Sequence, residues 1–558
     1  MSGAVAASAK GATFLILLQV GSRALTFALN QILLRYLSPE TLGLSARLDL
    51  FSNTALYFAR ESLRVALQRH PGSIQAVVNF SYLSILLGVP LTCGLAALYL
   101  RAEAAPGADA PFLPESVRAY GLASVVELLS EPCFVAAQQK LLYKVRAAAE
   151  SAATVAKCLA TCGTAVWASR SGIDAGVLPF AVGQVVYSVL LLGVYLPRMY
   201  PVARREGFSL LPTRIQSKDP NEYILSLFSR PLFALSVSMY FQSSIKYVLT
   251  QADSLLIASM ATLAEQGEYA LASNYGGLIA RMLFQPIEES SRNLFAKLCA
   301  PISPPPPSPS PPHPPQDPPQ TSPRTASSPP SKPRRSRAAL RQARTTLHLV
   351  LKSYLVLSLP LATLGPAGAP LLLRLVAGPR WASSQGPAVL AAYCFYIPLL
   401  ALNGVSEAFV AAAAGGPALW AQAAAMLAVT AAFAAAVWVC IVLVGWGASG
   451  LVLANGVNMA LRIAFNAAFI ARFFGEEGVR LDFLGVLPSA MSVAAATAVP
   501  PLLKVSEGAL GAYGLVGELV RVGAVGVVFC GVLAILERDF LLQCYRVVRP
   551  APREDEKK

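Results

Sequence analysis

Apolar stretches of about 20 residues recur along almost the whole chain, and short polar connections separate them. An α-helix of about that length crosses a hydrocarbon core of about 30 Å, so each stretch is a candidate transmembrane span. Charged residues interrupt the second, fourth and eighth stretches. The pattern predicts an all-α polytopic membrane protein with fourteen spans, at residues 13–36, 46–66, 74–100, 117–139, 149–168, 178–197, 231–260, 269–296, 347–373, 386–414, 418–444, 447–471, 482–503 and 513–536.

A repeat relates the two halves of the chain. Polar residues at intervals of four and seven share one helical face in the first and the seventh span: Gln19, Arg23 and Asn30, then Gln242, Lys246 and Asp253. Each set is followed by a short turn with a glycine, Gly43 or Gly267, and then by a charged helix with Glu61-Ser-Leu-Arg64 or Glu289-Ser-Ser-Arg292. Because six spans separate the copies, the repeat predicts two pseudo-symmetric six-helix lobes in parallel topology.

Two long polar segments divide the chain further. Residues 301–337 are almost half proline with a basic end, a composition that buries no core and favours disorder. The other long connection lies at 201–230. We therefore expect an N-lobe at 1–200, a cytosolic loop at 201–230, a C-lobe at 231–473 with a disordered cytosolic insert at 301–337, and two further spans with a cytosolic tail at 474–558.

The composition supports this interpretation, since 55% of the residues are hydrophobic, 13% are charged and the mean hydropathy is +0.54. The formal net charge of +15 could indicate nucleic acid, but the positions of the cations favour a membrane topology instead. One set of alternate connections holds 28 of the 45 lysines and arginines, and the other set holds 6. By the positive-inside rule the first set is cytosolic, which places both termini in the cytosol.

Ionisable side chains inside spans are costly in lipid and should face the protein interior or a wet cavity. In four spans the polar residues keep helical intervals: Arg281, Gln285, Glu288 and Arg292 with Glu289 beside them, then Asn455, Asn458, Arg462 and Asn466, then Tyr396, Asn403 and Glu407, and finally Lys157, Thr161 and Thr164. Polar residues scattered without regard to face would not keep these intervals. The sequence predicts a polar, partly hydrated cavity between the two lobes.

Arg60 and Arg64 lie one turn apart in the second span and leave two interpretations open. Glu61 and Glu289 could neutralise the neighbouring arginines and lock the lobes together, as buried polar groups do. Alternatively, some cations remain to bind an anionic ligand, for which arginine offers bidentate contact with phosphate.

The sequence lacks the motifs that several kinds of enzymatic reaction require. The chain contains no GxxxxGK[ST] phosphate loop and only three histidines, none of them in a span interior, and no DxD-type motif lies on a predicted lumenal loop. We therefore expect no enzymatic activity, no catalytic residue, no metal site and no cofactor. Transport or scaffolding remains.

Six segments of the chain form a recognisable set. They are LLQVGSRALTFALNQILLRYLS at 17–38, FARESLR at 58–64, ESAATVAKCLAT at 150–161, NYGGLIARMLFQPIEES at 274–290, AAYCFYIPLLALNGVSEAF at 391–409 and LANGVNMALRI at 453–463. Together they resemble the Rft family of endoplasmic-reticulum proteins. The resemblance implies a fold similar to the MOP flippases, which include the MATE exporters and the bacterial lipid II flippases. It also implies an endoplasmic-reticulum membrane location and a role in N-glycosylation.

The substrate that the resemblance implies is dolichyl-diphosphate carrying five mannoses on two N-acetylglucosamines, moved from the cytosolic to the lumenal leaflet. The family-pattern residues carried over are Arg23, Arg60, Glu61, Arg64, Lys157, Lys246, Arg281, Glu288, Glu289, Glu407 and Arg462, to which the spacing adds Asn30, Gln285 and Asn458 as cavity residues. Asp253 departs from the glutamate expected nearby in relatives.

Three hypotheses follow. The protein moves the oligosaccharide lipid itself by alternating access or scrambling, with cations holding the diphosphate and the polyprenyl tail in lipid. Or it assists the same pathway without transporting, as a lipid chaperone. Or it is a cation-coupled exporter, which an acidic cavity would favour, although basic residues slightly exceed acidic ones in the predicted spans.

Overall fold

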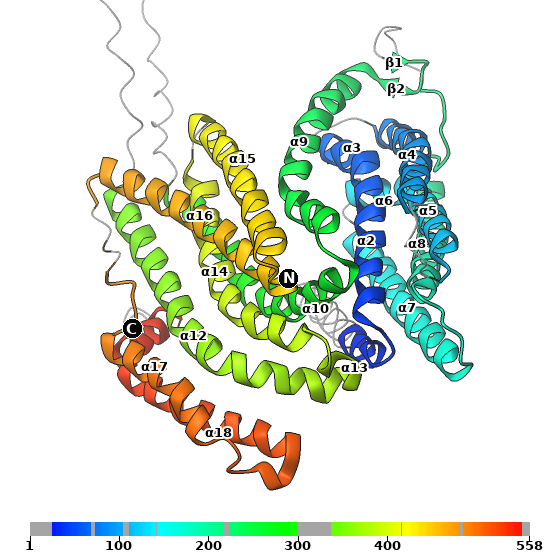
Figure 1. The fold of residues 1–558 in the computed structure, drawn as a ribbon. Coiled ribbons are helices and arrows are strands. Elements are labelled where there is room, and N and C mark those ends of the chain that lie inside the picture. The colour runs from blue at the N-terminus through cyan, green and yellow to red at the C-terminus, as the bar shows by residue number, and fades with distance from the viewer. Residues whose placement is uncertain are drawn as a thin grey trace, which may run out of the picture. The chain divides into compact units, whose positions relative to one another are not determined.

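The computed structural model describes residues 25–68, 73–103, 111–140, 142–215, 223–299, 336–414, 416–479, 482 and 484–548. Helices dominate this part of the chain, and Figure 1 shows their order. After a helix at Leu25–Leu34, the elements up to the long insert are α2 (Pro39–Leu56), π-helix η1 (Tyr57–Glu61), α3 (Ser62–Gln68), α4 (Ile74–Glu103), α5 (Leu113–Leu128), α6 (Glu131–Gln139), α7 (Tyr143–Arg170), α8 (Leu178–Glu206), strands β1 (Tyr223–Ile224) and β2 (Phe228–Ser229), α9 (Arg230–Met260), α10 (Leu263–Ile279), π-helix η2 (Ala280–Phe284) and α11 (Gln285–Leu298).

The elements after the insert are again helical. They are α12 (Arg337–Ala377), α13 (Pro379–Ala382), α14 (Gly386–Ala413), α15 (Gly416–Trp438), π-helix η3 (Val439–Leu443), α16 (Gly447–Glu476), α17 (Ala490–Val505), 3-10 helix η4 (Gly511–Tyr513), α18 (Gly514–Leu536) and α19 (Arg538–Val548). The predicted disordered insert at 301–337 lies, except for its last two residues, outside the described residues.

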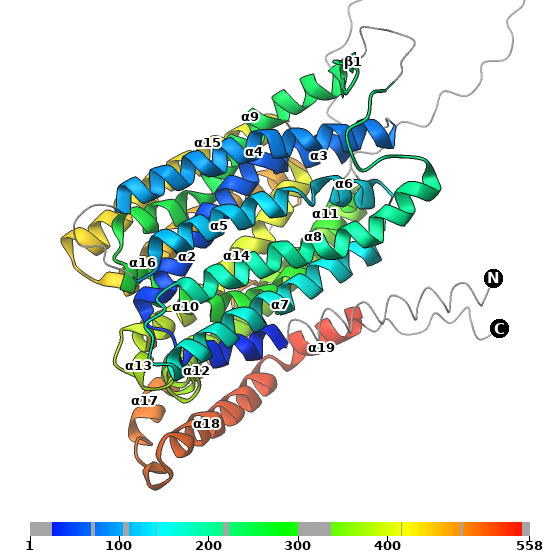
Figure 2. The same ribbon diagram turned by 90° about the vertical axis from the view of Figure 1, so that its right-hand side faces the viewer.

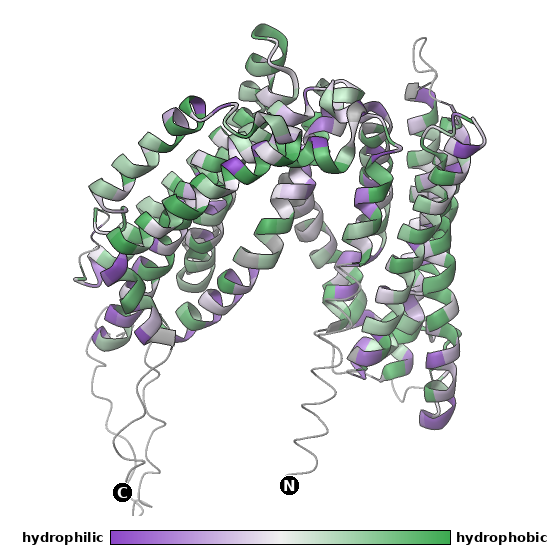
Figure 3. Cartoon of the chain, turned by 90° about the horizontal axis from the view of Figure 1, so that it is seen from below, coloured by the Kyte–Doolittle hydropathy of each residue, from purple (hydrophilic) through white to green (hydrophobic). Residues whose placement is uncertain are grey.

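Within the described residues helix covers most of every predicted span, but residues 13–24 of the first lie outside them and the thirteenth becomes helical only at Ala490, where α17 begins. Eight helices of the described part are long and apolar enough to cross a membrane, and two shorter apolar helices accompany them. Figure 3 shows apolar residues along most of the helices and hydrophilic ones at many of their ends. The all-α polytopic fold class is confirmed, and the count of fourteen spans stays a prediction.

None of the three spans that charges interrupt is a single α-helix, and the eleventh span, which charges do not interrupt, also ends in a π-helical turn, η3. The second and the eighth each contain a π-helical turn, η1 and η2. The fourth is divided into α5 and α6 after Leu128. Pro132 follows this break, and because proline has no N–H it cannot continue the hydrogen bonding of α5 toward Leu128.

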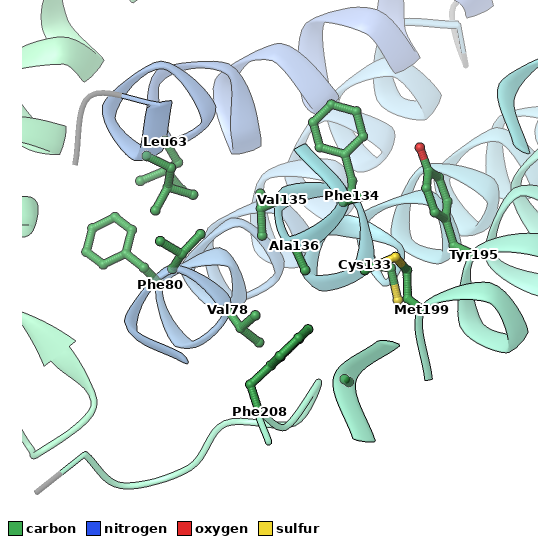
Figure 4. Packing of buried hydrophobic residues seen from close by; sticks show 14 of the residues in the cluster. Leu63, Val78, Phe80, Cys133, Phe134, Val135, Ala136, Tyr195, Met199 and Phe208 are labelled. Atoms are coloured by element: carbon green, nitrogen blue, oxygen red, sulfur yellow. The ribbon is translucent and has the colours of Figure 1, made fainter. Parts of the chain in front are cut away.

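The described chain forms two compact units. The first comprises 1–273, 369–390 and 433–452, and the second comprises 274–368, 391–432 and 453–558. In the first unit α4, α5, α8 and α7 lie side by side (Figure 2). A core cluster of this unit includes Phe80 of α4, Phe134 of α6, and Tyr195 and Met199 of α8, each at most 5% exposed (Figure 4). The lobe boundaries expected from the sequence stay a prediction.

Helices α2 and α10 of the first unit touch backbone to backbone at two glycines. Gly43 is the fifth residue of α2 and Gly267 the fifth of α10. A Cβ atom at Gly43 would overlap the carbonyl oxygen of Leu263, the first residue of α10, and one at Gly267 would overlap that of Pro39, the first residue of α2. The contact is therefore symmetric, as expected for equivalent positions of a repeat.

The ends of two further helices cap each other in the same unit. The guanidinium of Arg35 donates to the carbonyl of Val376 near the end of α12 at 2.9 Å. In return, Arg380 donates to the carbonyl of Tyr36 at 3.0 Å and the indole of Trp381 to that of Leu34 at 3.0 Å. Carbonyls at helix C-termini lack intrahelical partners, so these bonds satisfy both helix ends and join segments far apart in sequence.

The connection after α8 is held against α4 by two amide side chains. Gln75 accepts from the backbone N–H of Ser209 at 2.8 Å, and Asn79 donates to the carbonyl of Thr213 at 2.6 Å and accepts from its N–H at 3.0 Å. Asn79 is fully buried. This part of the predicted cytosolic loop is therefore an ordered strap, and Asn79, which begins a formal glycosylation sequon, has its amide fully engaged.

In the second unit α17 and α18 pair as a hairpin (Figure 1). Glu537, which follows α18 and is 4% exposed, joins the hairpin to α12. Its carboxylate accepts from the N–H of Ser489 at 2.6 Å and the hydroxyl of Ser492 at 2.9 Å, and lies 3.4 Å from the ammonium of Lys352. Burial alone would raise the pKa of Glu537, but these hydrogen bonds and the lysine together hold the pKa below its usual value.

A depressed carboxyl pKa predicts a specific loss of stability in acid. The contribution of Glu537 is present above the unfolded-state pKa of about 4.5 and is lost as the pH falls through the lower folded-state value. We expect Glu537→Gln to cost about 1.5–3 kcal/mol at neutral pH, because hydrogen bonds to a charged group are lost, and to flatten the fall in melting temperature between pH 6 and about pH 3. Glu507→Gln, at an exposed position, is the matched control. If the melting temperature of Glu537→Gln falls with pH as steeply as that of the wild type, the assignment is contradicted.

Candidate functional site

Two arginines of the second span lie against two glutamates from other helices of the first unit. Arg60 belongs to η1 and Arg64 to α3, whereas Glu127 lies in the last turn of α5 and Glu131 is the first residue of α6. Arg60 lies 2.8 Å from Glu127 and 3.2 Å from Glu131. Arg64 donates through Nε to Glu131 at 2.9 Å and pairs with it again through a second nitrogen. We call these four residues the arginine–glutamate cluster.

The cluster is largely dry and its formal charges cancel. The side chains of Glu127 and Glu131 are 6% and 1% exposed, and those of Arg60 and Arg64 are 17% and 18% exposed. Burying charges requires that they be paired and hydrogen-bonded, which two carboxylates against two guanidinium groups achieve. Within the described residues Glu61 forms no ion pair with either arginine. Acidic residues therefore do neutralise Arg60 and Arg64, as one interpretation expected. These acidic residues are Glu127 and Glu131 rather than Glu61.

Phe134 supports the cluster from α6. The guanidinium of Arg64 lies 3.7 Å from the centre of the Phe134 ring, and that of Arg146 lies 4.8 Å from it. Both distances are in the range of cation–π attraction. Arg146 is itself paired with Glu150 at 2.8 Å, so the positive charges around this ring are balanced.

Lys157 is surrounded by three other helices of the first unit. Its ammonium donates to the side-chain amide of Gln184 on α8 at 2.6 Å, and Asp49 on α2 is farther away, at 3.8 Å. Tyr120 on α5 donates to the same Asp49 carboxylate at 3.2 Å. The Lys157 side chain remains 30% exposed. The partner of Lys157 at hydrogen-bond distance is a neutral amide, so this bond does not neutralise the positive charge of the lysine.

In the second unit the polar stripe of α16 faces α14. The amide of Asn466 donates to the hydroxyl of Ser406 at 3.1 Å and to Asn403 at 3.4 Å, and Asn403 donates to Glu407 at 3.1 Å. One turn away, Arg462 donates to Asn458 at 3.1 Å. Asn403, Asn458 and Asn466 are buried, whereas Arg462 is partly exposed. The helical spacing predicted from the sequence therefore does place these groups on an interior face.

Glu288 on α11 packs onto α14 where Gly404 leaves room. A Cβ atom at Gly404 would overlap the Glu288 carboxylate. Glu288 also interacts electrostatically with Arg292, Glu407 and Glu289. Glu289 accepts from Gln285 at 3.0 Å and both are exposed.

The predicted stripe from Arg281 to Arg292 needs one correction. The intervals assumed α-helical geometry, but Ala280–Phe284 is π-helical. A π-helical turn contains more residues than an α-helical one, so the α-helical register assumed for the stripe is shifted across this turn. Pro286 at the start of α11 accompanies this change of helix type.

Three predicted residues cannot be placed. Arg23 lies outside the described residues, and so do the side chains of Lys246 and Arg281. Asn30 is exposed on the first helix. The predicted cavity between the lobes stays a prediction. Among the described residues no three His, Cys, Asp or Glu side chains lie close enough to hold a metal ion.

Sequence reasoning missed four residues that the structure places in these groups: Glu127, Glu131, Asp49 and Gln184. Glu127 and Glu131 stand four apart in the fourth predicted span, where their charges had counted only as an interruption. Their spacing matches that of Arg60 and Arg64, and this complementary pattern is the signal that could have found them.

The fold defines the class of this protein. Over 95% of this chain and 100% of the other, the structure resembles the lipid II flippase MurJ in an inward closed conformation, with a TM-score of 0.55 and 10% identity. It also resembles an inward-facing multidrug resistance MATE family transporter of the MOP superfamily, over 81% and 95% of the two chains, with a TM-score of 0.53 and 12% identity. At such low identities the likeness shows the fold alone, a polytopic helical fold like that of these two transporters.

The sequence comparisons identify the family within that class. The model of the Rft protein family matches residues 7–547, and this chain belongs to the Rft family. The Man(5)GlcNAc(2)-PP-dolichol translocation protein RFT1 of Yarrowia lipolytica is 32% identical over 87% of this chain and 73% of its own length. The proteins of that name from Saccharomyces cerevisiae and Mus musculus are 32% and 29% identical, over 84% of this chain and over 83% and 84% of their lengths. The family resemblance of the motifs is thus confirmed.

Proposed function

We propose that this protein translocates dolichyl-diphosphate carrying five mannoses and two N-acetylglucosamines between membrane leaflets, for protein N-glycosylation. The observation that carries the proposal is the match along most of the chain to relatives named for that translocation. The flippase-like fold and the polar side chains within helices of both units support it. In this proposal the protein lies in the endoplasmic-reticulum membrane, both termini are cytosolic and transfer runs from the cytosolic to the lumenal leaflet.

The contacts suggest which cations meet the diphosphate. Arg60 and Arg64 are already neutralised by Glu127 and Glu131, so using them would require breaking a buried network. Lys157 and Arg462 have neutral amides as their hydrogen-bond partners and stay partly exposed. A phosphate oxygen can replace an amide oxygen and gain a charge-assisted bond. Lys157 in the first unit and Arg462 in the second are therefore each proposed as a cation that can bind the diphosphate, and Asn458 and Asn403 of the second unit as partners for sugar hydroxyls.

Vesicle reconstitution tests this assignment. Purified protein should move the dolichyl-diphosphate heptasaccharide across the bilayer, and Lys157→Gln and Arg462→Gln should each slow transfer about 10-fold or more, as expected for a lost charged hydrogen bond of about 1.5–3 kcal/mol. Arg170→Gln, at an exposed position on the same helix as Lys157, is the matched control. Equal rates in all variants would contradict the assignment.

A non-transporting accessory role in the same pathway is the second candidate, and the neutralised arginine–glutamate cluster favours it because fewer cations remain for an anionic ligand. The two roles differ in one measurement. If vesicles with wild-type protein transfer no lipid while a positive-control flippase does, and the same protein restores glycosylation in depleted cells, the accessory role replaces translocation.

A further inference from the structure

A partly open pocket of the first unit lies apart from the groups described above and has a volume of about 670 Å³. Its walls come from the start of α2, the end of α7, the loop before α8, and Pro111, Leu263 and Arg380. These segments are the connections that the distribution of lysine and arginine predicts to be lumenal. The volume is within the range of small-molecule sites, about 300–1,000 Å³, and exceeds what one sugar ring requires.

The loop that forms one wall has a fixed backbone. Gly176 has a φ of +50°, and a Cβ atom there would lie 2.5 Å from the carbonyl oxygen of Pro111. The N–H of Gly176 donates to the carboxylate of Asp174 at 3.1 Å. Arg380, another lining residue, is held by its bond to the carbonyl of Tyr36. The pocket is therefore shaped before any ligand binds, which lowers the entropic cost of binding.

A strained residue stands beside the pocket. Phe112 has a φ of +58°, which is uncommon for a bulky residue, and its neighbours Pro111 and Leu113 both line the pocket. The Phe112 side chain is 44% exposed. Strained backbone of this kind is concentrated at functional sites. An exposed aromatic ring also offers a face to the C–H side of a sugar ring.

The lining combines acceptors, donors and apolar surface. Glu40 and Asp174 are exposed carboxylates that accept hydrogen bonds, and Arg380 donates them. The lining residues include four that carry hydroxyls, Tyr36, Ser38, Thr41 and Ser169, together with leucine, valine and proline residues. A polyhydroxylated neutral ligand requires both donors and acceptors, because each of its hydroxyls is both.

Other ligand classes fit less well. Two carboxylates against one guanidinium leave the lining net negative, which disfavours a phosphate group. The described residues contain no group of three metal-binding side chains for a divalent cation. The balance of polar and apolar surface points to carbohydrate.

We propose that this pocket binds the oligosaccharide part of the lipid-linked substrate, through its sugar hydroxyls and apart from its diphosphate. This inference rests on the proposed function, since it names a second binding site for the same substrate. Glu40 and Asp174 accept from mannose hydroxyls, Arg380 donates to a ring or hydroxyl oxygen, and the apolar lining covers the sugar faces. The pocket would hold the glycan on the side where translocation delivers it.

The test uses the full-length protein in detergent and the free heptasaccharide of five mannoses and two N-acetylglucosamines, without lipid or phosphate. Saturation-transfer difference NMR should detect binding, and the double variant Glu40→Gln with Asp174→Asn should weaken the affinity about 10-fold or more. Ser169→Trp, which fills the pocket, should abolish binding. Glu115→Gln, at an exposed acid of α5 that does not line the pocket, should leave binding unchanged.

Melting temperatures that match the wild type will show that the variants fold. The inference is overturned if the wild type does not bind the heptasaccharide, if the pocket variants bind it as well as the wild type, or if inorganic pyrophosphate displaces it. These outcomes are independent of lipid transfer in vesicles. A protein that transfers the lipid but fails the glycan test keeps its proposed function and loses only the pocket.

Discussion

Replacing Gly43 with alanine should push α2 away from α10 and destabilise the protein by about 3 kcal/mol, at the upper end of the cost of overpacking. The added Cβ atom meets the carbonyl oxygen of Leu263, which is backbone and cannot rotate away as a side chain would. Gly267→Ala should have a similar effect, because the added Cβ atom meets the carbonyl of Pro39, which is the equivalent position on α2. Melting temperature in detergent measures both losses.

The chain provides a matched control at Gly163. This glycine lies inside α7, and a Cβ atom there has no atom within 4 Å. Alanine is favoured over glycine within a helix by about 0.5–1 kcal/mol, so Gly163→Ala should be neutral or stabilising. Since Gly43 and Gly267 form one contact, the double variant should cost less than the two single losses together. Single variants as stable as Gly163→Ala would show that α2 and α10 do not cross at this point.

The glycine contact shows what a repeat in the sequence gives and what it omits. The repeat indicated that Gly43 and Gly267 are equivalent, because each follows a polar span and precedes a charged helix. It did not indicate that the two glycines touch. Equivalence is a property of order along the chain, whereas contact depends on how the two copies pack. Only the close approach of two backbones explains why both positions lack a side chain.

The helices themselves were predictable because apolar length is a local property. The breaks within the helices were less predictable. The π-helical turns at Tyr57–Glu61 and Ala280–Phe284 leave no distinct apolar period, and they change which residues share a face. The end of α5 before Pro132 could have been expected from proline alone, and the charges of Glu127 and Glu131 on either side mark the same place.

The partners of the charged residues were not predictable from one helix at a time. Spacing placed Arg60 and Arg64 on one face, but it could not show which helix faces them. Glu127 and Glu131 come from two other helices of the first unit. In contrast, Asn466 and Asn403 were both assigned to interior faces, and the structure brings them together at 3.4 Å.

Removing the charge of Glu131 should be the most damaging single change in the arginine–glutamate cluster. Glu131→Gln leaves Arg60 and Arg64, only 17% and 18% exposed, with Glu127 as the one remaining carboxylate of the cluster. Breaking a buried ion pair by removing one partner costs about 3–5 kcal/mol. Glu150→Gln is the control, because its pair with Arg146 is 39% and 43% exposed and such pairs contribute at most about 1 kcal/mol. Melting temperatures of the two variants should therefore differ clearly.

A double variant then distinguishes two roles of the arginine–glutamate cluster, one in folding and one in binding the substrate. If the cluster serves folding, Arg64→Gln combined with Glu131→Gln should regain part of the stability that Glu131→Gln loses, because the unpaired guanidinium is gone. Lipid transfer per folded molecule should then be unchanged in the double variant. If the double variant folds but transfer is lost, Arg64 binds the anionic substrate despite its pairing with Glu131. Ion pairing in the resting structure would then be a reversible step, in which the diphosphate replaces the Glu131 carboxylate at the same guanidinium.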